Sequence, residues 1–445
     1  MEYFIGLDIG TSAVKGALMS VDGVVVTTAQ AAFNYTVEGT AKLLDPGHFT
    51  EACFSVIRSL SSRADGHVAA ICSCCASGDP LFLDDAMEPI SPIVGWQTQV
   101  PWEDINAVYT KDEQDAFYRR CGWGFFEGMP AADLAWIKRH KPELLEKCGF
   151  FCMHAEYLNY LITGEWGISR SMGTPSYLID QEKGEYYTPL LEKFGLDVSM
   201  LPPIYEKGTV LASVLPEAAE ALGVSADTKV VLGSFDHPSG ALGAGVLEPG
   251  QLLLSCGTSW VELFPVEDRG HALSTGGLVD RFALNGPGWC VMKSLESVSD
   301  KIDRLREHFF GKVPHKYFDG LAGEGEPGCH GLVFDFTDED YERAEGHGKQ
   351  DIARAVIEGA ARMLGDNLKN LEKCGLTADS ITAIGGITNS PICVDIISRA
   401  LGKKIDVING QSAGAVGSCL LAGIGTGYYK NEKEAFGIMN AARIK

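Results

Sequence analysis

The same local pattern occurs once in each half of the chain: an apolar run, the tripeptide Gly-Thr-Ser, and a second apolar run. The first copy lies between the apolar runs 4–9 and 14–21, and the second lies between the runs 252–255 and 260–264. Apolar runs of this length that are separated by turn residues predict paired β-strands. A unit of this kind at the start of both halves predicts an internal duplication with a ligand bound between the copies.

Each Gly-Thr-Ser turn has the chemistry of a phosphate-binding hairpin, because free backbone N–H groups there can face an anion and two hydroxyls add donors. In the first copy Asp8 precedes the turn and Lys15 follows it. A carboxylate at this place can hold a hydrated Mg²⁺ ion. Asp and Gly are also selected by ordinary turns, so a structural role stays open for one copy alone. Two copies favour an ATP-binding protein.

Other nucleotide-binding patterns are missing from the sequence. It contains neither the Walker sequence G-x-x-x-x-G-K-[ST] nor a G-x-G-x-x-G that follows a predicted strand. This disfavours the P-loop and Rossmann classes, and with them a dehydrogenase.

The length of 445 residues predicts more than one domain. Glu248-Pro249-Gly250 breaks the chain between a predicted helix and the strand at 251–256. We therefore expect an N-terminal domain at 1–247, which contains the first Gly-Thr-Ser turn, and a C-terminal domain at 248–445, which contains the second.

Charge and composition limit the partners of the protein. The chain has 37 Lys and Arg against 59 Asp and Glu, a formal net charge of −22, which argues against a nucleic-acid or anionic-membrane surface. The start of the chain lacks the features of a signal peptide, and no apolar stretch approaches the roughly 18 residues of a spanning helix. The 13 cysteines fit buried thiols in a reducing cytoplasm. We therefore expect a cytoplasmic protein with a small-molecule partner, and a homodimer stays open.

Asp236 lies between a predicted strand at 229–233 and a predicted helix of small residues at 239–246. The positive end of the helix dipole stabilises a carboxylate there. As a functional residue, Asp236 would act as a general base that takes the proton of a hydroxyl attacking a γ-phosphate. An ordinary helix cap explains the same residue. The neighbouring His237 either contacts substrate or is a hydrogen-bonded scaffold residue.

A fourth motif lies near the C-terminus, where a predicted strand at 381–384 is followed by Gly385, Gly386 and Asn389 and then by a predicted helix at 392–401. Small residues between strand and helix make a surface of bare backbone on which a flat nucleoside can lie. Any one of these glycines can equally be a capping or packing residue.

Taken in order, DIGTSAVK, GSFDHPSGALGAG, SCGTS and AIGGITNSP resemble the motifs of the FGGY carbohydrate kinases. The segments AEYL at 155–158 and LITGE at 161–165 are similar to that family's KDYL and LTGE stretch. The resemblance covers essentially the whole chain. It implies an α/β, two-domain actin/hexokinase-like fold of ribonuclease-H-type halves that binds Mg·ATP and a sugar or polyol.

The resemblance also implies a role for each matching residue. Asp236 would be the catalytic base, in contact with the substrate together with His237, and Asp8 would hold Mg²⁺ through water. The residues implied to bind ATP are Asp8, Gly10, Thr11, Ser12 and Lys15, then Gly257, Thr258 and Ser259, and, at the adenosine, Gly385, Gly386 and Asn389.

The sequence departs from the xylulokinase-like pattern in the sugar pocket. Ala76-Ser77-Gly78-Asp79 replaces Gln-Met-His-Gly, and Trp96-Gln97-Thr98 replaces Trp-Asn-Asp. We expect Asp79 and Trp96 to contact the substrate, because a carboxylate accepts two hydroxyls and an indole face suits C–H groups. A turn Asp and a core Trp fit these positions equally well.

We therefore expect ATP-dependent phosphorylation of a ketose such as xylulose, or of a polyol. The alternative is a non-catalytic or chaperone-like ATP-binding protein of the same fold, because a fold does not fix a function.

Overall fold

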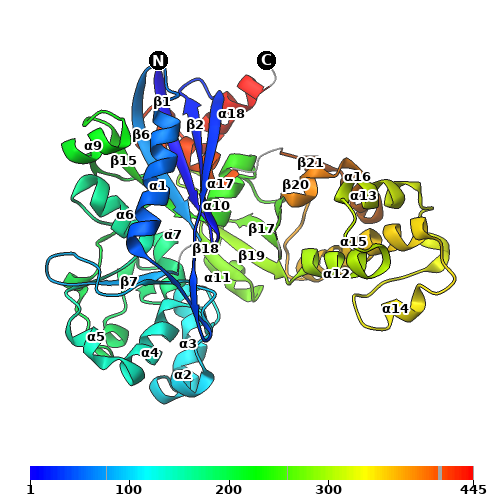
Figure 1. Cartoon of the computed structure of the whole chain (residues 1–445), viewed down its shortest axis with the longest axis horizontal. Helices are drawn as coiled ribbons and strands as arrows, with labels where there is room; N and C mark the ends of the chain where they lie inside the picture. Colours follow the sequence, from blue (N-terminus) through cyan, green and yellow to red (C-terminus); the bar gives the residue numbers. More distant parts are fainter. Residues whose placement is uncertain (77, 258, 409–412, 444–445) are drawn as a thin grey trace. The chain divides into compact units, whose positions relative to one another are not determined.

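The computed structural model of the protein describes residues 1–76, 78–257, 259–408 and 413–443 (Figure 1). Within these residues the chain forms two compact units. Unit 1 contains Met1–Gly245, Gly277–Trp289 and 413–443, and unit 2 contains Val246–Gly276 and 290–408. The expected domain boundary after residue 247 lies close to the first change of unit. The segments 277–289 and 413–443 follow that boundary in sequence but belong to unit 1.

Unit 1 is built on a six-stranded sheet with the strand order β14-β15-β6-β1-β2-β3. The strands are β1 (Glu2–Ile9), β2 (Ala13–Ser20), β3 (Val25–Ala32), β6 (His67–Cys75), β14 (Val210–Ser213) and β15 (Lys229–Phe235). β1, β2 and β3 pair antiparallel, whereas β6 runs parallel to both β1 and β15. The carboxyl ends of β1, β6 and β15 therefore lie at one edge of the sheet, where α/β proteins bind ligands.

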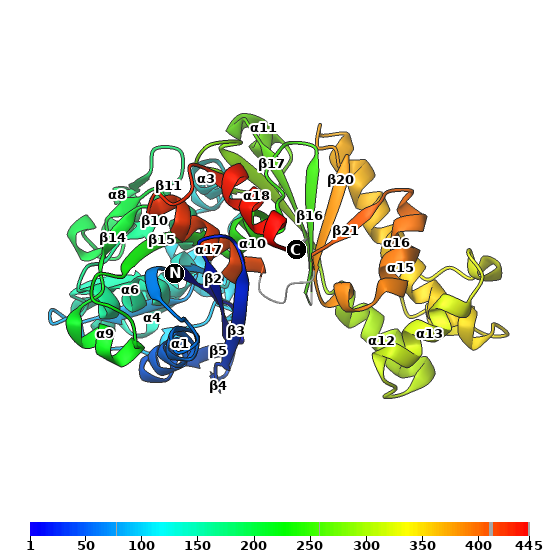
Figure 2. The ribbon, with the colours of Figure 1, turned by 90° about the horizontal axis from the view of Figure 1, so that it is seen from above.

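Helices cover both faces of this sheet, which explains why β1 and β6 are continuous apolar runs. The helix α1 (Pro46–Ser61) begins at the cap Asp45, whose side chain accepts the N–H of His48 at 2.8 Å. Its apolar face packs on the side chains of Leu7 and Val14. The helix α17 (Ala413–Gly425) lies against the opposite face of β1, so that β2 is seen between the two helices in Figure 2.

Glycines allow α17 and α10 (Asp236–Ala244) to approach their neighbours unusually closely. A Cβ added to Gly6 of β1 would lie 1.9 Å from the carbonyl oxygen of Ala415, far inside van der Waals contact. Between the two helices, a Cβ on Gly417 would lie 1.9 Å from the carbonyl oxygen of Ser239. The Ser239 hydroxyl donates to the carbonyl of Gly414 at 2.9 Å, which fixes the helix pair.

Unit 2 repeats the local topology of unit 1. The strands lie in the order β19-β17-β16-β20-β21, and β16 pairs antiparallel with β17 but parallel with β20. The strands are β16 (Gln251–Cys256), β17 (Trp260–Val266), β19 (Trp289–Leu295), β20 (Ser380–Gly385) and β21 (Ile405–Val407). The helices of this unit include α12 (Val298–Phe310), α13 (His315–Glu324), α15 (Lys349–Glu372) and α16 (Pro391–Leu401). A hairpin next to a parallel strand thus occurs in both units, as the repeated Gly-Thr-Ser pattern predicts.

The start of α10 differs from the sequence-based expectation of a helix at 239–246. The helix begins at Asp236, its N-cap is Phe235, and it ends before Gly245, which has φ 74°. Asp236 is therefore a first-turn residue and not a cap, and its Oδ1 accepts the N–H of His237 at 2.7 Å. Pro238 fits the first turn because the N–H groups there need no intrahelical partner.

Sequence patterns did not indicate α2 (Trp102–Val108), α3 (Lys111–Cys121), α9 (Pro216–Leu222), α12, α13 or α18 (Glu432–Arg443).

We expect Gly417→Ala to destabilise the protein by about 1–3 kcal/mol, the usual cost of overpacking a filled core. Gly437→Ala is the matched control, because Gly437 also lies in a helix but a Cβ there would meet nothing within 4 Å. Since alanine favours helix by up to ~1 kcal/mol over glycine, the control should be neutral or stabilised. Urea unfolding of both variants measures the difference, and equal effects would contradict the close approach of α10 and α17.

Candidate active site

Two carboxylates lie at the carboxyl edge of the unit 1 sheet. Asp8 stands next to the last residue of β1, and Asp236 follows β15 directly as the first residue of α10. The pKa of Asp8 is raised to about 7, first by burial and then by the negative charge of Asp236, while Lys15 and the thiol of Cys74 lower it. Burial also raises the pKa of Asp236. The fold thus brings together the two carboxylates that the sequence assigns to metal and to base.

The first Gly-Thr-Ser turn joins β1 to β2 beside these carboxylates. The N–H of Gly10 donates to the carbonyl of Ala13 at 3.0 Å, which closes the turn. Lys15 stands opposite Asp8 in the register of the hairpin. Ser12 is exposed, and Gly10 and Thr11 are half-buried. The turn therefore presents hydroxyls, backbone and one cation next to Asp8.

Asp79 and Trp96, both expected to contact substrate, are linked to each other and to this turn. The Oδ1 of Asp79 accepts the backbone N–H of Trp96 at 2.6 Å. The indole N–H of Trp96 donates to Oγ1 of Thr11 at 2.9 Å. Burial raises the pKa of Asp79 to about 7, and the hydrogen bond from Trp96 opposes the shift. The structure therefore places the candidate sugar residues beside the first phosphate motif.

Two buried residues near Asp79 were missed by the sequence analysis. His154 begins α6 (His154–Thr163); its backbone N–H donates to the carbonyl of Asp79 at 3.1 Å, and its Nδ1 lies 3.9 Å from Oδ2 of Asp79. Burial lowers the pKa of His154 to about 4, so the ring is neutral. Asp133 lies in the first turn of α4 (Pro130–His140), and its pKa is raised by burial and by the charge of Asp79.

The side chains of Asp133 and His154 both contain an atom that is available to a ligand. Oδ2 of Asp133 and Nδ1 of His154 are buried, and neither has a hydrogen-bond partner in the described parts of the chain. Unpaired buried polar atoms are costly, so they mark places where a ligand or water supplies the missing partner. A lone His or Asp in a helical segment carries no such signal in sequence, because its relation to Asp79 is tertiary.

The second Gly-Thr-Ser turn lies between β16 and β17 in unit 2. The N–H of Gly257 donates to the carbonyl of Ser259 at 3.2 Å, and Thr258 lies outside the described residues. The hydroxyl of Ser299 donates to the carbonyl of Gly257 at 2.6 Å, and the N–H of Ser297 donates to Oγ of Ser259 at 3.2 Å. Ser297 has φ 54°, which is rare for a residue with a side chain. The start of α12 is thus tied to the turn, a contact that no sequence pattern indicated.

The glycines of the adenosine motif lie beside that second turn. Gly385 pairs with Cys256 and has φ 90°, and a Cβ on it would lie 2.4 Å from the Cys256 carbonyl oxygen. Glycine is therefore required at this position. Gly386 and Asn389 begin and end a short 3₁₀ turn, and both are exposed. Unit 2 thus brings Gly257, Ser259 and Gly385 together.

The residues that could hold a metal ion are few. Within the described residues, no three or more His, Cys, Asp or Glu side chains form a metal-binding group. Mg²⁺ needs no such cage, since it usually keeps several waters and binds one or two carboxylates together with substrate phosphates. Asp8, at the end of β1, carries carboxylate oxygens of the kind that Mg²⁺ prefers.

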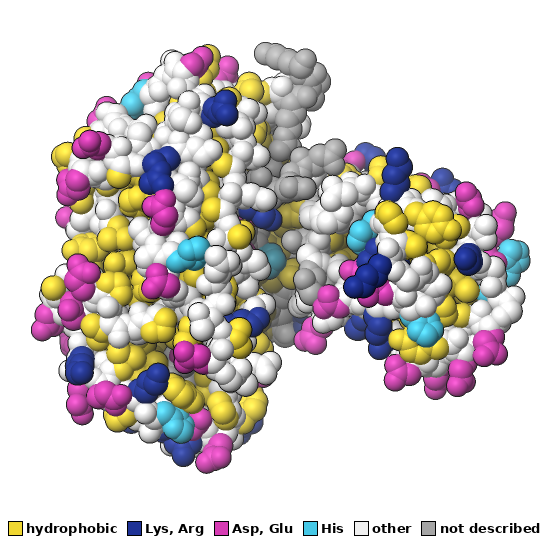
Figure 3. Space-filling model, in the orientation of Figure 1, with side chains coloured by type: hydrophobic (Ala, Val, Ile, Leu, Met, Phe, Trp, Pro, Cys, Tyr) yellow, Lys and Arg dark blue, Asp and Glu magenta, His cyan; other side chains and the backbone are white. Residues whose placement is uncertain are grey.

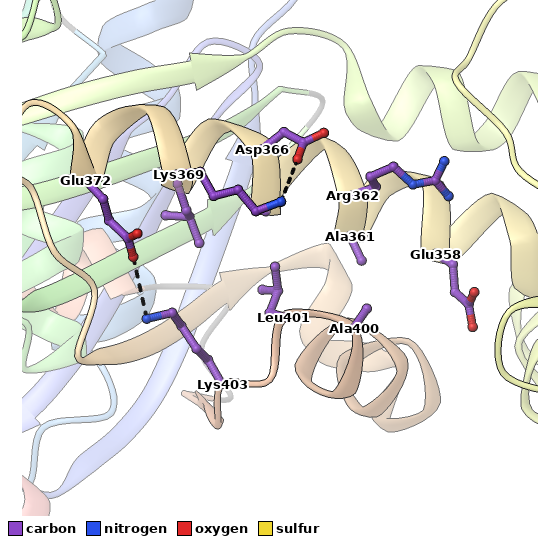
Figure 4. A pocket seen from close by; sticks show the side chains of 11 residues that line it. Glu358, Ala361, Arg362, Asp366, Lys369, Glu372, Ala400, Leu401 and Lys403 are labelled. Carbon is purple, nitrogen blue, oxygen red and sulfur yellow. Dashed lines mark hydrogen bonds and ion pairs between the residues drawn. The ribbon is translucent and has the colours of Figure 1, made fainter.

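Charged side chains of both signs lie on the surface outside the candidate site. On the face seen in Figure 3, acidic and basic side chains are interspersed. A groove of about 410 Å³ lies between α15 and α16 (Figure 4), but its Lys369 pairs with Asp366 at 3.0 Å and its Lys403 with Glu372 at 3.9 Å. No described helix has the length and apolar character that crossing a membrane requires.

Comparisons with known proteins bear on the family of the chain. Residues 3–243 match the model of the N-terminal domain of the FGGY family of carbohydrate kinases, and residues 321–426 match the model of its C-terminal domain. The xylulose kinase of Staphylococcus epidermidis is 24% identical over 96% of this chain and 89% of its own length. The autoinducer-2 kinase of Salmonella typhimurium is 23% identical over 97% of this chain and 88% of its own length.

The crystal structure of a ligand-bound xylulose kinase from Lactobacillus acidophilus has the same fold, with a TM-score of 0.86 at 21% identity over 98% of this chain and 92% of that one. The expected two-domain actin/hexokinase-like α/β fold is confirmed. The matches to both domain models show that the chain belongs to the FGGY family of carbohydrate kinases.

Proposed function

We propose that the protein transfers the γ-phosphoryl group of ATP to a hydroxyl of a ketose, with xylulose as the first candidate and a polyol as the second. The observation that carries the proposal is the pairing of Asp8 with Asp236 beside a Gly-Thr-Ser turn, at the ligand-binding edge of the unit 1 sheet. Family membership already makes the protein an ATP-dependent sugar kinase. The relatives named xylulose kinase favour a ketose, whereas the relative named autoinducer-2 kinase shows that similar chains act on other compounds.

In this proposal Asp236 acts as the general base. Its Oδ1 accepts the N–H of His237, which orients the carboxylate and leaves Oδ2 for the hydroxyl of the substrate. A raised pKa suits this task, because a base whose pKa lies nearer to the working pH binds the transferred proton more strongly. His237, whose Nε2 lies 4.0 Å from Oδ1 of Asp236, would contact the substrate from the next position.

The nucleotide would be held by backbone and hydroxyl groups rather than by a basic surface. Residues 1–247 would supply the sugar site, the base and the first phosphate motif, with Asp8, Gly10, Thr11, Ser12 and Lys15. Residues 248–445 would supply Gly257, Thr258 and Ser259 for phosphate and Gly385, Gly386 and Asn389 for adenosine. Asp8 would hold Mg²⁺ through water, and bound Mg²⁺ neutralises phosphate charge. The reaction would take place in the cytoplasm.

The sugar would lie against Asp79 and Trp96. The backbone N–H of Trp96 occupies Oδ1 of Asp79, so Oδ2 and the neighbouring Nδ1 of His154 are the groups that can meet substrate hydroxyls. Oδ2 of Asp133 is a further buried polar atom without a partner in the described residues. Buried polar atoms of this kind suit a molecule with several hydroxyls, which donate and accept hydrogen bonds, as ketoses and polyols have.

The proposed function is tested by measuring ADP release across a panel of ketoses, aldoses and polyols. We expect release above the basal rate with at least one ketose or polyol. ATP binding without release for any sugar would instead support the non-catalytic alternative.

With the accepted sugar, we expect Asp236→Asn to lower kcat by roughly 10²–10⁴, the usual contribution of a general base. The affinity for Mg·ATP, measured by calorimetry, should change little, because the amide keeps the shape of the carboxylate. A turnover close to that of the unaltered protein would show that another group accepts the proton.

We expect Asp79→Asn to raise the KM for the sugar by roughly 10–100-fold, since a hydrogen bond to a charged group is worth about 1.5–3 kcal/mol. The KM for ATP should stay the same. The control is Asp84→Asn, because Asp84 lies close by in the chain, is only half-buried, and its side chain accepts the N–H groups of Ala86 and Glu88 in a local turn. If both variants have the same KM for the sugar, Asp79 has only a structural role.

A further inference from the structure

A short hydrogen-bond relay ends one residue before Asp236. Oδ2 of Asp280 accepts the hydroxyl of Ser171 at 2.7 Å. Oγ of Ser171 in turn accepts the backbone N–H of Phe235 at 3.0 Å. Phe235 is the last residue of β15 and the N-cap of α10, so the relay ends on the backbone N–H of the residue that precedes the proposed base.

The side chains of this relay are buried, and both oxygens of the Asp280 carboxylate accept hydrogen bonds. Asp280 is 0% exposed and Ser171 is 1% exposed. Oδ1 of Asp280 also accepts the N–H of Arg281 at 2.7 Å and the hydroxyl of Thr174 at 3.3 Å. Burial raises the pKa of Asp280 to about 7, and these donors together with the nearby Lys207 oppose the shift. Burying a carboxylate away from water costs free energy unless such donors surround it. Asp280 therefore has a specific role and does not merely fill the core.

The backbone at Phe235 is supported less regularly than the rest of β15. The register of β15 with β6 shifts between Leu232 and Phe235, and pairing resumes only at Phe235 with Cys75. The side chain of Phe235 cannot cap α10, and no side-chain cap is present there. Ser171 therefore supplies a hydrogen bond to the backbone at the point where the strand ends and the helix begins.

The same contact explains why the segment 277–289 belongs to unit 1. Asp280 lies on β18 (Leu278–Arg281), and Ser171 lies on α7 (Arg170–Gly173). The side chain of Gln181, which donates to the carbonyl of Val279 at 2.7 Å, anchors the same segment. The chain thus returns to unit 1 at β18, where the Asp280 carboxylate supports the start of α10 through Ser171.

We propose that Ser171 and Asp280 are positioning residues that fix the start of α10 and thereby the direction of the Asp236 carboxylate. The Asp280 carboxylate accepts a hydrogen bond from the Ser171 hydroxyl. Oγ of Ser171 thereby becomes a stronger acceptor for the N–H of Phe235, because consecutive hydrogen bonds polarise one another. The inference rests on the proposed function only in that Asp236 is taken as the base.

The test is Ser171→Ala, which removes both hydrogen bonds. With the accepted sugar we expect kcat to fall roughly tenfold, the effect of one buried hydrogen bond, while the KM values for ATP and sugar stay the same. Hydrogen exchange in the peptide 229–244 should become faster. Ser171→Thr keeps the hydroxyl and should restore both properties. Asp280→Asn serves as a second variant if Ser171→Ala does not fold, and it should show the same direction of change.

The matched control is Ser176→Ala. Ser176 is also buried, donates to the carbonyl of Gly173 at 2.6 Å and accepts the N–H of Leu178 at 3.1 Å, but it has no link to Asp236. Its loss should lower the melting temperature without changing kcat measured well below that temperature. If Ser171→Ala behaves in the same way, the positioning role is wrong.

A double variant separates the two proposals. If Ser171 acts through Asp236, Ser171→Ala should not lower kcat further in the Asp236→Asn protein, and a full additional loss would overturn the inference.

If the unaltered protein phosphorylates no sugar, the proposed function fails. The exchange rates of 229–244 in Ser171→Ala and Ser176→Ala then still decide whether the relay holds the start of α10, and equal rates would overturn it.

Discussion

The packing of α17 against β1 on one side and against α10 on the other is the constraint on which the site of unit 1 depends. Where a Cβ would be at Gly6, Gly243 and Gly417, a backbone carbonyl of the neighbouring element is present. A close-packed interior cannot absorb a side chain at such points without moving a whole helix. α10 starts with Asp236, and a Cβ on Gly414 of α17 would lie 2.7 Å from Oδ2 of Asp8. The packing of the two helices therefore sets the position of both carboxylates.

The acidic character of the protein has a local counterpart in this site. Asp8, Asp79 and Asp236 are all carboxylates whose pKa burial raises, and the cation within the first phosphate motif is Lys15. A polyanion such as ATP would be repelled here without compensation. In the proposed function, backbone N–H groups at the turns, hydroxyls and a hydrated Mg²⁺ would supply it, and the N–H groups and hydroxyls do so without adding to the formal charge of the chain, which is −22.

The central strands and the motif residues were predictable because their signals are local. The apolar runs of β1 and β16 identified strands, and Gly-Thr-Ser identified the turns. The start of α10 was not predictable, because Asp236 also suits a cap and only the backbone at Phe235 decides between the two. His154, Asp133 and Asp280 were missed for a different reason. Each is an ordinary residue in its own segment, and its importance comes from a partner that is distant in sequence.

Glycine has both a local role, which the neighbouring sequence indicates, and a tertiary role, which it does not. Gly385, with φ 90°, belongs to a motif and lets the backbone of β20 turn beside β16, so its role follows from its own sequence neighbourhood. Gly6 and Gly417 have ordinary backbone angles, and their role comes from carbonyl groups that other elements bring within about 2 Å of the absent Cβ. The 52 glycines of the chain therefore indicate a site only in part. The remainder is the space that two helices need to bring Asp8 and Asp236 to the same edge of a sheet.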